Sequence, residues 1–170
     1  YGYHGGNSER LVGKALQDGY RAKVHLATKL PSWLVKEPSD FDRLLNEQLG
    51  KLQDEHIDVY LLHSLNANLW RTLLENDVLE SAAKAQADGR IGQLAFSFHD
   101  SLEAFRTIVD GYDRWAMCQI QYNYMNEEVQ AGTEGLRYAA SKGLAVVIME
   151  PLLGGRLVNP PQAVREAWEA

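Results

Sequence analysis

Two chargeable side chains stand at the ends of apolar runs in the sequence. Lys29 closes the run over 24–29, and His63 closes the run over 57–63. A third run ends at Ser97, so these positions are evenly spaced (63 − 29 and 97 − 63 are both 34). This interval suits one strand–helix unit of a (β/α) barrel, where active sites form at the carboxyl ends of the strands. The spacing therefore predicts that these positions take part in catalysis.

Tyr3, Lys29 and His63 together have the chemistry to reduce a carbonyl group. An ammonium close to a phenol in a partly desolvated pocket stabilises the phenolate, which helps a tyrosine to give up its proton. A neutral histidine can donate a hydrogen bond to the carbonyl oxygen and orient it while hydride arrives at the carbon. These three residues are therefore the candidate catalytic residues.

The composition is that of a globular protein, with 45% apolar and 24% charged residues. A formal net charge of −6 argues against nucleic acid or an anionic membrane surface as a partner. The chemistry of the three candidate residues instead favours a small-molecule carbonyl substrate. We also expect no membrane span and no signal segment, which favours a cytoplasmic location. Cys118 is the one cysteine, so neither a disulfide framework nor a metal site is expected. The composition does not indicate the oligomeric state.

Five apolar runs predict strands, over 24–30, 57–63, 91–98, 117–122 and 145–149. Apolar spacing and capping residues predict helices over 9–16, from Ser39, over 78–87, over 101–111, over 133–142, and after Pro160-Pro161. Strands that are almost continuously apolar are typical of a parallel sheet covered by helices. The competing architecture, a doubly wound sheet, usually carries a G-x-G-x-x-G turn after its first strand, and the sequence has no such turn.

The sequence also resembles the aldo-keto reductase superfamily through short motifs that run in order along essentially the whole chain. These are Tyr3, Ser8-Glu9, Gly13, Ala15-Leu16, Ala27-Thr28-Lys29, the run over 57–63, 89–92 leading to Phe96-Ser97, Gln119 and Tyr122-Asn123. The stretches over 97–100, 149–152 and 159–161 resemble a bacterial and archaeal branch, some of whose members carry a C-terminal 4Fe-4S segment. The resemblance implies a single partial (β/α)8 TIM barrel over 1–170, with about five βα units present and the first strands and last unit missing.

The resemblance implies hydride transfer between NADP or NAD and an aldehyde or ketone. Tyr3 matches the general acid, Lys29 the cation that tunes it and His63 the residue that orients the carbonyl. The positions that match the cofactor site are Ser97 and Gln119 at the nicotinamide carboxamide, Met149 at the nicotinamide ring, and Pro151, Leu152 and Gly154 in a loop that wraps the pyrophosphate. A 4Fe-4S segment would follow Ala170.

The chain departs from the family pattern in three ways. The catalytic aspartate of the family lies five residues before the tyrosine and would precede Tyr1, which is itself a rival for Tyr3. Phe98 stands where many members have asparagine, and Met149 stands where many have an aromatic residue. We therefore expect an internal fragment that is inactive alone, and an open sheet whose unpaired edges favour association.

Two other functions stay open at this point. The departures at Phe98 and Met149 suit a regulatory or redox-sensing barrel that binds the cofactor with little turnover. Lys29 also suits a Schiff-base lysine of an aldolase-type barrel. Among the remaining residues, His99 suits either a wall of the pocket or a cap of the helix that begins at Ser101, and we favour the cap. Glu150 suits either a pocket carboxylate or a hydrogen-bond acceptor behind it, and Trp33 and Trp70 suit the wall of a substrate pocket. Trp115 and Cys118 are expected in the core.

Overall fold

The computed structural model describes residues 1–170, and its five strands form one parallel sheet in sequence order. The strands are β1 (Ala27–Leu30), β2 (Ile57–Leu65), β3 (Ile91–Phe98), β4 (Met117–Gln121) and β5 (Ala145–Met149). Each strand pairs only with its neighbours in sequence, so β1 and β5 form the two edges. This order is that of a (β/α) barrel, whereas the strand order of a doubly wound sheet reverses at a switch point.

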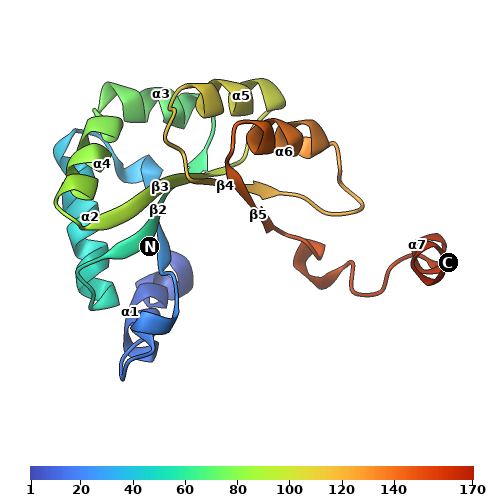
Figure 1. The fold of residues 1–170 in the computed structure, drawn as a ribbon, viewed down its shortest axis with the longest axis horizontal. Coiled ribbons are helices and arrows are strands. Elements are labelled where there is room, and N and C mark those ends of the chain that lie inside the picture. Colours follow the sequence, from blue (N-terminus) through green and yellow to red (C-terminus); the bar gives the residue numbers. More distant parts are fainter.

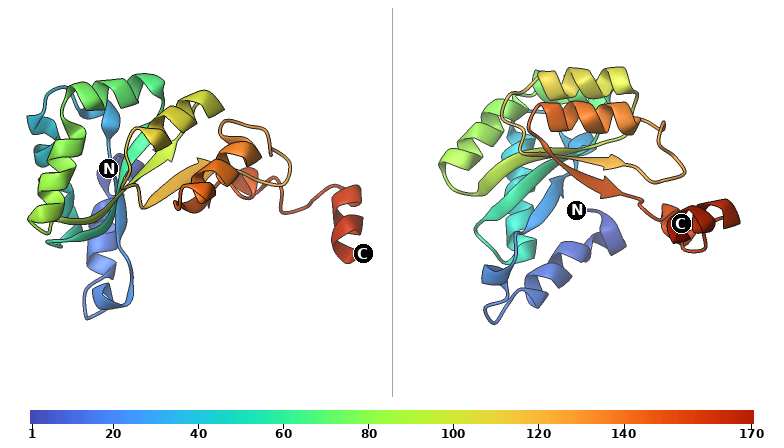
Figure 2. Two further views of the ribbon diagram at one scale, coloured as in Figure 1. Left: turned by 45° about the horizontal axis from the view of Figure 1, so that its top comes forward. Right: turned by 45° about the vertical axis from the view of Figure 1, so that its right-hand side comes forward.

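The helices lie mainly on one side of this sheet (Figures 1 and 2). They are α1 (Ser8–Ala15), α2 (Ser39–Leu52), α3 (Ala67–Glu75), α4 (Val78–Ala87), α5 (Leu102–Asp110), α6 (Gly132–Ser141) and α7 (Gln162–Glu169). Helices α2 to α6 follow the outside of the sheet, while α7 projects away from it at the C-terminal end. None of the helices combines the length and apolarity needed to cross a bilayer.

Alternation along the strands separates the hydrophobic core from the inner face of the sheet. Successive side chains of a strand point to opposite faces, and the parallel register aligns Lys29 with Leu61, and Leu61 with Ala95. In the middle of the strands, Tyr60 and Phe96 are fully buried in the core cluster beneath the helices. The positions between them, including Lys29, Leu61 and Ala95, therefore face the inner side, which no helix of the chain covers.

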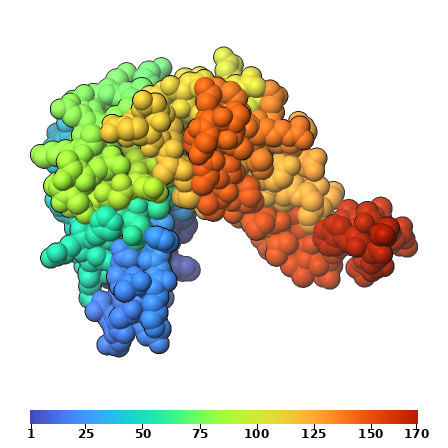
Figure 3. Space-filling view, in the orientation of Figure 1, coloured from blue at the N-terminus to red at the C-terminus, as the bar shows by residue number.

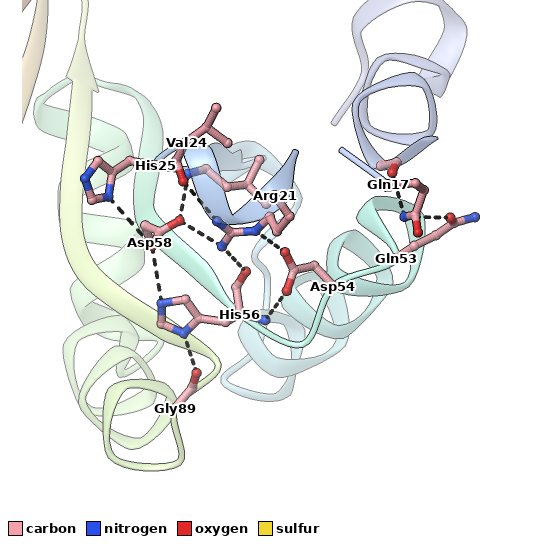
Figure 4. A network of polar contacts seen from close by, with 11 residues as sticks. Gln17, Arg21, Val24, His25, Gln53, Asp54, His56, Asp58 and Gly89 are labelled. Atoms are coloured by element: carbon pink, nitrogen blue, oxygen red, sulfur yellow. Dashed lines mark hydrogen bonds and ion pairs between the residues drawn. The ribbon is translucent and has the colours of Figure 1, made fainter. Parts of the chain in front are cut away.

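A polar network fixes the amino ends of β1 and β2 (Figure 4). Asp58 Oδ2 accepts hydrogen bonds from the backbone N–H of Leu26 (2.7 Å), and Arg21 Nη2 lies 2.8 Å from the same oxygen. Arg21 also pairs with Asp54 and donates to the carbonyl oxygen of Val24 (3.1 Å). Because Arg21 holds the chain in a turn here, β1 begins at Ala27, and the predicted start at residue 24 is wrong.

Helix α3 was not predicted from the sequence. It begins after Asn66, whose Oδ1 accepts the N–H of Leu69 at 2.9 Å. The helix carries Trp70, which is 4% exposed and packs against Trp115 with 5.8 Å between ring centroids. Trp70 lines a shallow pocket between α3 and α5 and is absent from the lining of the cavity at the strand ends, whereas the core position of Trp115 is confirmed.

The predicted helix cap at Ser101 is present, but the predicted role of His99 is not. Ser101 Oγ accepts the N–H of Ala104 at 3.3 Å, and Asp100 accepts the N–H of Ser101 at 2.7 Å. These two side chains cap α5 between them, and His99 takes no part in the cap. The expectation for His99 is therefore wrong.

Gly13 allows α1 to lie directly against the end of α2. A Cβ added at Gly13 would lie 2.4 Å from the carbonyl oxygen of Leu52. We expect Gly13→Ala to lower the free energy of unfolding by about 1–3 kcal/mol, because the contact is with backbone and the helices must separate. Gly50→Ala is the matched control, since nothing lies within 4 Å of that Cβ position and alanine favours the helix of α2.

Urea unfolding of the whole protein that carries each substitution checks this expectation. Gly13→Ala should lower the midpoint, whereas Gly50→Ala should keep or raise it. A midpoint for Gly13→Ala equal to that of Gly50→Ala would contradict the close packing of α1 on α2.

Candidate active site

A cavity of about 510 Å³ opens at the carboxyl ends of the strands. It lies on the inner side of the sheet, where the molecule is hollowed between its N-terminal and C-terminal parts (Figure 3). The ten residues that line it come from every strand and from the segment before α1: Tyr3, Lys29, His63, Ser64, Ser97, His99, Gln119, Gln121, Met149 and Glu150. The sheet thus brings together six of the predicted site residues, namely Tyr3, Lys29, His63, Ser97, Gln119 and Met149.

Tyr3 and His63 are in direct contact inside this cavity. The phenol oxygen of Tyr3 lies 3.3 Å from His63 Nε2, although 60 residues separate the two positions. The His63 residue is 8% exposed, and its other nitrogen, Nδ1, is buried without a hydrogen-bond partner. Trp33 packs against the same imidazole, with 5.1 Å between ring centroids. Nε2 is therefore the ring nitrogen of His63 that has a polar neighbour, and that neighbour is the hydroxyl of Tyr3.

The cavity keeps His63 neutral at physiological pH. Burial, together with the nearby charge of Lys29, lowers the pKa of His63 to about 4. Burial also lowers the pKa of Lys29, whose ammonium makes no hydrogen bond or ion pair within the chain. The site thus holds a neutral imidazole, a phenol and an unpaired lysine together.

The two N-terminal tyrosines point in different directions. Tyr1 donates from its phenol to Glu47 Oε2 (2.9 Å), and Lys51 Nζ lies 3.9 Å from the centre of its ring. Burial and the bond to Glu47 raise the pKa of Tyr1. Tyr1 is therefore held on α2, outside the set that lines the cavity, whereas Tyr3 is within it.

A buried amide ties the segment of Tyr3 to the strand of Lys29. Gln48 Nε2 donates to Glu9 in α1 and to the backbone carbonyl oxygen of Lys29 (2.9 Å). Gln48 Oε1 accepts the hydroxyl hydrogen of Tyr60 in β2 (2.7 Å), and Thr28 donates to the same Glu9 carboxylate (2.7 Å). Glu9, Gln48 and Tyr60 are all buried. One network therefore sets α1, β1 and β2 relative to one another.

A β-bulge follows His63 and connects it to Ser97. The pairing of β2 with β3 shifts register between Leu62 and Leu65, and Ser64 has φ 54°. The backbone N–H of Ser64 donates to Ser97 Oγ at 2.8 Å. Bulges of this kind occur next to active sites because they redirect a side chain at a strand end.

The residues expected to hold a cofactor fall into two groups. Ser97, 1% exposed, and Gln119, whose side chain makes no hydrogen bond within the chain, line the cavity with Met149. The chain that follows β5 carries Pro151, Leu152 and Gly154, and these three are not among the lining residues. The polar lining offers unused donors and acceptors that fit an amide such as a carboxamide.

Phe98 points away from the cavity. It is fully buried in the outer layer, where its ring lies 5.0 Å from that of Phe105. The next residue on the inner face is His99, which lines the cavity. Sequence analysis missed Gln121, favoured a cap over the pocket for His99, and left the role of Glu150 open; all three line the cavity. The alternation Ser97–His99 and Gln119–Gln121 was a signal that both members of each pair share a face.

Cys118 lies in the core, as expected. It is fully buried, and burial raises the pKa of its thiol to about 12. A thiol in this state is unreactive, so it has no part in the chemistry of the cavity.

Fold and site together define the class of protein as a (β/α) barrel with a strand-end cavity, and the comparisons give the family. The family model of the aldo/keto reductase family matches residues 1–166. The chain belongs to the aldo/keto reductase family. No curated protein sequence matches it.

Solved structures of aldo-keto reductases share the fold. A thermostable aldo-keto reductase in complex with the inhibitor epalrestat has a TM-score of 0.77 and 24% identity, covering 98% of this chain and 58% of that chain. An aldo-keto reductase from Klebsiella pneumoniae in complex with NADP and acetate has a TM-score of 0.73 and 26% identity, covering 93% and 53%. The holo form of an aldo-keto reductase from Bacillus halodurans has a TM-score of 0.73 and 23% identity, covering 90% and 49%.

The chain thus spans about half the length of these structures, as the shares of 49% to 58% show. Its five parallel strands in sequence order match their barrels, which confirms the predicted partial (β/α)8 fold.

Because the pKa of His63 is lowered in the folded protein, the free energy of unfolding should depend measurably on pH. In the unfolded chain the pKa of His63 has its ordinary value of 6.5, and in the folded protein it is about 4. Between these values the unfolded chain binds more protons, so the free energy of unfolding falls as the pH falls. The full shift corresponds to roughly 3 kcal/mol.

We expect His63→Gln to lose this part of the acid destabilisation, measured by urea unfolding at about pH 7 and about pH 4.5. His25→Gln serves as the control, because the His25 side chain is 93% exposed. An equal loss of stability on acidification in both variants would contradict a neutral, buried His63.

Proposed function

We propose that the whole protein containing this chain transfers hydride between NADP or NAD and an aldehyde or ketone. The observation that carries the proposal is the contact of Tyr3 with a neutral His63, 3.3 Å apart, in a cavity that also holds the unpaired ammonium of Lys29. Membership of the aldo/keto reductase family supports an oxidoreductase activity, and the Klebsiella pneumoniae structure with NADP supports that cofactor.

Each side chain has a distinct part in the proposed reaction. A carbonyl oxygen placed between Tyr3 Oη and His63 Nε2 accepts hydrogen bonds from both. His63 donates from Nε2, because Nδ1 has no acceptor within reach and a buried unpaired N–H is costly. Tyr3 gives its proton to the oxygen as negative charge develops there, and the ammonium of Lys29 stabilises the phenolate that forms.

The inner face has suitable residues for the nicotinamide end of the cofactor. Ser97 and Gln119 would hold the carboxamide, and Met149 would contact the ring. Pro151, Leu152 and Gly154 would lie along the pyrophosphate in the segment after β5. When bound, the reduced nicotinamide supplies the hydride. A 4Fe-4S centre finds no ligand set within 1–170, where Cys118 is the one cysteine and is buried.

The activity is assigned to the whole protein, in which residues 1–170 form part of one barrel domain in the cytoplasm. The chain alone leaves the inner face of the sheet open, with Val147 of the edge strand β5 40% exposed. We therefore expect the isolated 170-residue chain to be inactive, since the cavity has walls on only some of its sides.

Replacing Tyr3 tests the proposal with a matched control two residues away. Tyr3→Phe should lower kcat for NADPH-dependent aldehyde reduction by about 10²- to 10⁴-fold, the usual contribution of a positioned acid. Tyr1→Phe should retain activity, because Tyr1 is held on α2 by Glu47 and Lys51. The measurement is the loss of NADPH absorbance with a panel of aldehydes and ketones.

Unchanged turnover by Tyr3→Phe would remove Tyr3 from the mechanism. Tight NADPH binding by the unaltered protein without turnover of any carbonyl would instead favour a cofactor-binding regulatory barrel. That alternative has the support of Met149, which places no aromatic ring at this wall of the cavity.

A further inference from the structure

Two consecutive residues of the loop after β4 hold both ends of the segment that follows β5. Asn123 Nδ2 donates to the carbonyl oxygen of Glu150 (3.3 Å) at the near end of this segment. The hydroxyl of Tyr124 donates to the carbonyl oxygen of Leu157 (2.9 Å) at the far end. Residues 150–157 therefore form a loop whose two ends are tied to adjacent residues of another loop.

The near end of this segment is fixed by several contacts. Asn123 is 4% exposed, and its Oδ1 accepts the backbone N–H of Met125 at 3.0 Å. The backbone N–H of Tyr122 donates to the carbonyl oxygen of Met149, the last residue of β5, at 3.3 Å. Because these bonds involve the backbone and a buried amide, the near end continues the rigid edge of the sheet.

The far end depends on the side chain of Tyr124. Its hydroxyl makes the one hydrogen bond that joins residues 151–157 to any part of the chain before β5. Its ring packs against Trp168 of α7, with 5.3 Å between ring centroids. The other hydrogen bonds of the segment are local, such as the bond from Gly155 N–H to the carbonyl oxygen of Leu152 (2.8 Å). Loss of the hydroxyl would therefore release the far end and leave the sheet intact.

The backbone between these anchors leaves donors free. Leu153 and Gly154 have φ 47° and 63°, in the left-handed region that leucine rarely adopts. A leucine persists in this conformation only where the surrounding structure enforces it. The backbone N–H groups of Leu152 and Gly154 make no hydrogen bond within the chain. Free N–H groups in a stretch of this kind form a concavity that binds anions, so the segment fits a phosphate group.

We propose that Tyr124 is a positioning residue for the dinucleotide cofactor. Its hydroxyl holds the far end of residues 150–157, so that the N–H groups of Leu152 and Gly154 are available to the pyrophosphate before the cofactor binds. A segment that is ordered in advance binds more tightly, because less conformational entropy is lost on binding. The inference rests on the proposed function, because it takes NADP or NAD as the ligand.

Amide hydrogen exchange of the whole protein without cofactor tests the anchor itself. Tyr124→Phe removes the hydroxyl and keeps a ring against Trp168. We expect faster exchange of the N–H groups of Leu153, Gly155 and Leu157, because their local hydrogen bonds open more often once the far end is free.

The affinity for NADPH tests the link between this anchor and the cofactor. Fluorescence titration should give a Kd for Tyr124→Phe that is raised about threefold to tenfold, the usual effect of one hydrogen bond. Tyr138→Phe is the matched control, because its hydroxyl donates from α6 to Asp110 of α5 (2.7 Å). This control should leave the exchange of residues 150–157 and the Kd for NADPH as they are in the unaltered protein.

The outcomes distinguish this inference from the proposed function. Unchanged exchange of residues 150–157 in Tyr124→Phe would overturn the anchor, whatever the affinity for the cofactor. Faster exchange with an unchanged Kd for NADPH would overturn the positioning role and leave the reductase proposal standing. If the unaltered protein binds neither NADPH nor NADH, both the inference and the proposed function fall.

Discussion

The buried amide of Gln48 is the interaction on which the arrangement of the site depends. It joins Glu9 of α1, the backbone of Lys29 in β1 and the hydroxyl of Tyr60 in β2. An unpaired buried polar group costs about 1–3 kcal/mol, so none of these segments can shift without a penalty. Tyr3 lies in the segment that precedes α1, Lys29 in β1 and His63 in β2. The network therefore joins the three parts of the chain that carry the proposed catalytic residues.

In the parallel sheet, successive side chains of each strand point to opposite faces, one toward the core and one toward the cavity. In the middle of the strands, Tyr60 and Phe96 form the core with the helices, and their neighbours Leu61 and Ala95 face the inner side. At the carboxyl ends this inner side changes from apolar residues, such as Leu61 and Ala95, to the polar residues of the cavity. The residues that form the core and the residues that line the cavity therefore lie on opposite faces of the same strands. This is why the cavity can keep unpaired donors without weakening the core.

Much of this arrangement could be predicted from the sequence because it follows from local patterns. The strands over 91–98 and 145–149 have the predicted bounds, and the strand-end positions of Lys29 and His63 meet in one cavity. The features that were missed depend on contacts between distant segments. The sequence favoured a helix cap over the pocket for His99, but its ring lines the cavity and contacts Gln130, 31 residues away. Gln130 lies in a loop and has a backbone φ of 58°. The spacing of apolar residues does not predict such a conformation.

The extra helix α3 and the late start of β1 were missed for a similar reason. Both are decided by single side-chain bonds, from Asn66 to Leu69 and from Asp58 to Leu26. Hydrophobic periodicity identifies the faces of elements, whereas such bonds decide where an element begins. Tyr3 was preferred over Tyr1 only because it lies nearer Ser8-Glu9, as the family pattern asks; the contacts of Tyr1 with Glu47 and Lys51 supply the physical reason.

Transfer of a deuterium label tests the central claim most directly. The whole protein is supplied with NADPH deuterated at C4 of the nicotinamide and with a protiated aldehyde, and the alcohol is analysed by mass spectrometry and NMR. Our account expects one deuterium on the carbinol carbon of the alcohol, with a solvent-derived proton on its oxygen. Alcohol formed without the label from either C4 position, or label lost to solvent, would contradict direct hydride transfer in the cavity of Tyr3, Lys29 and His63.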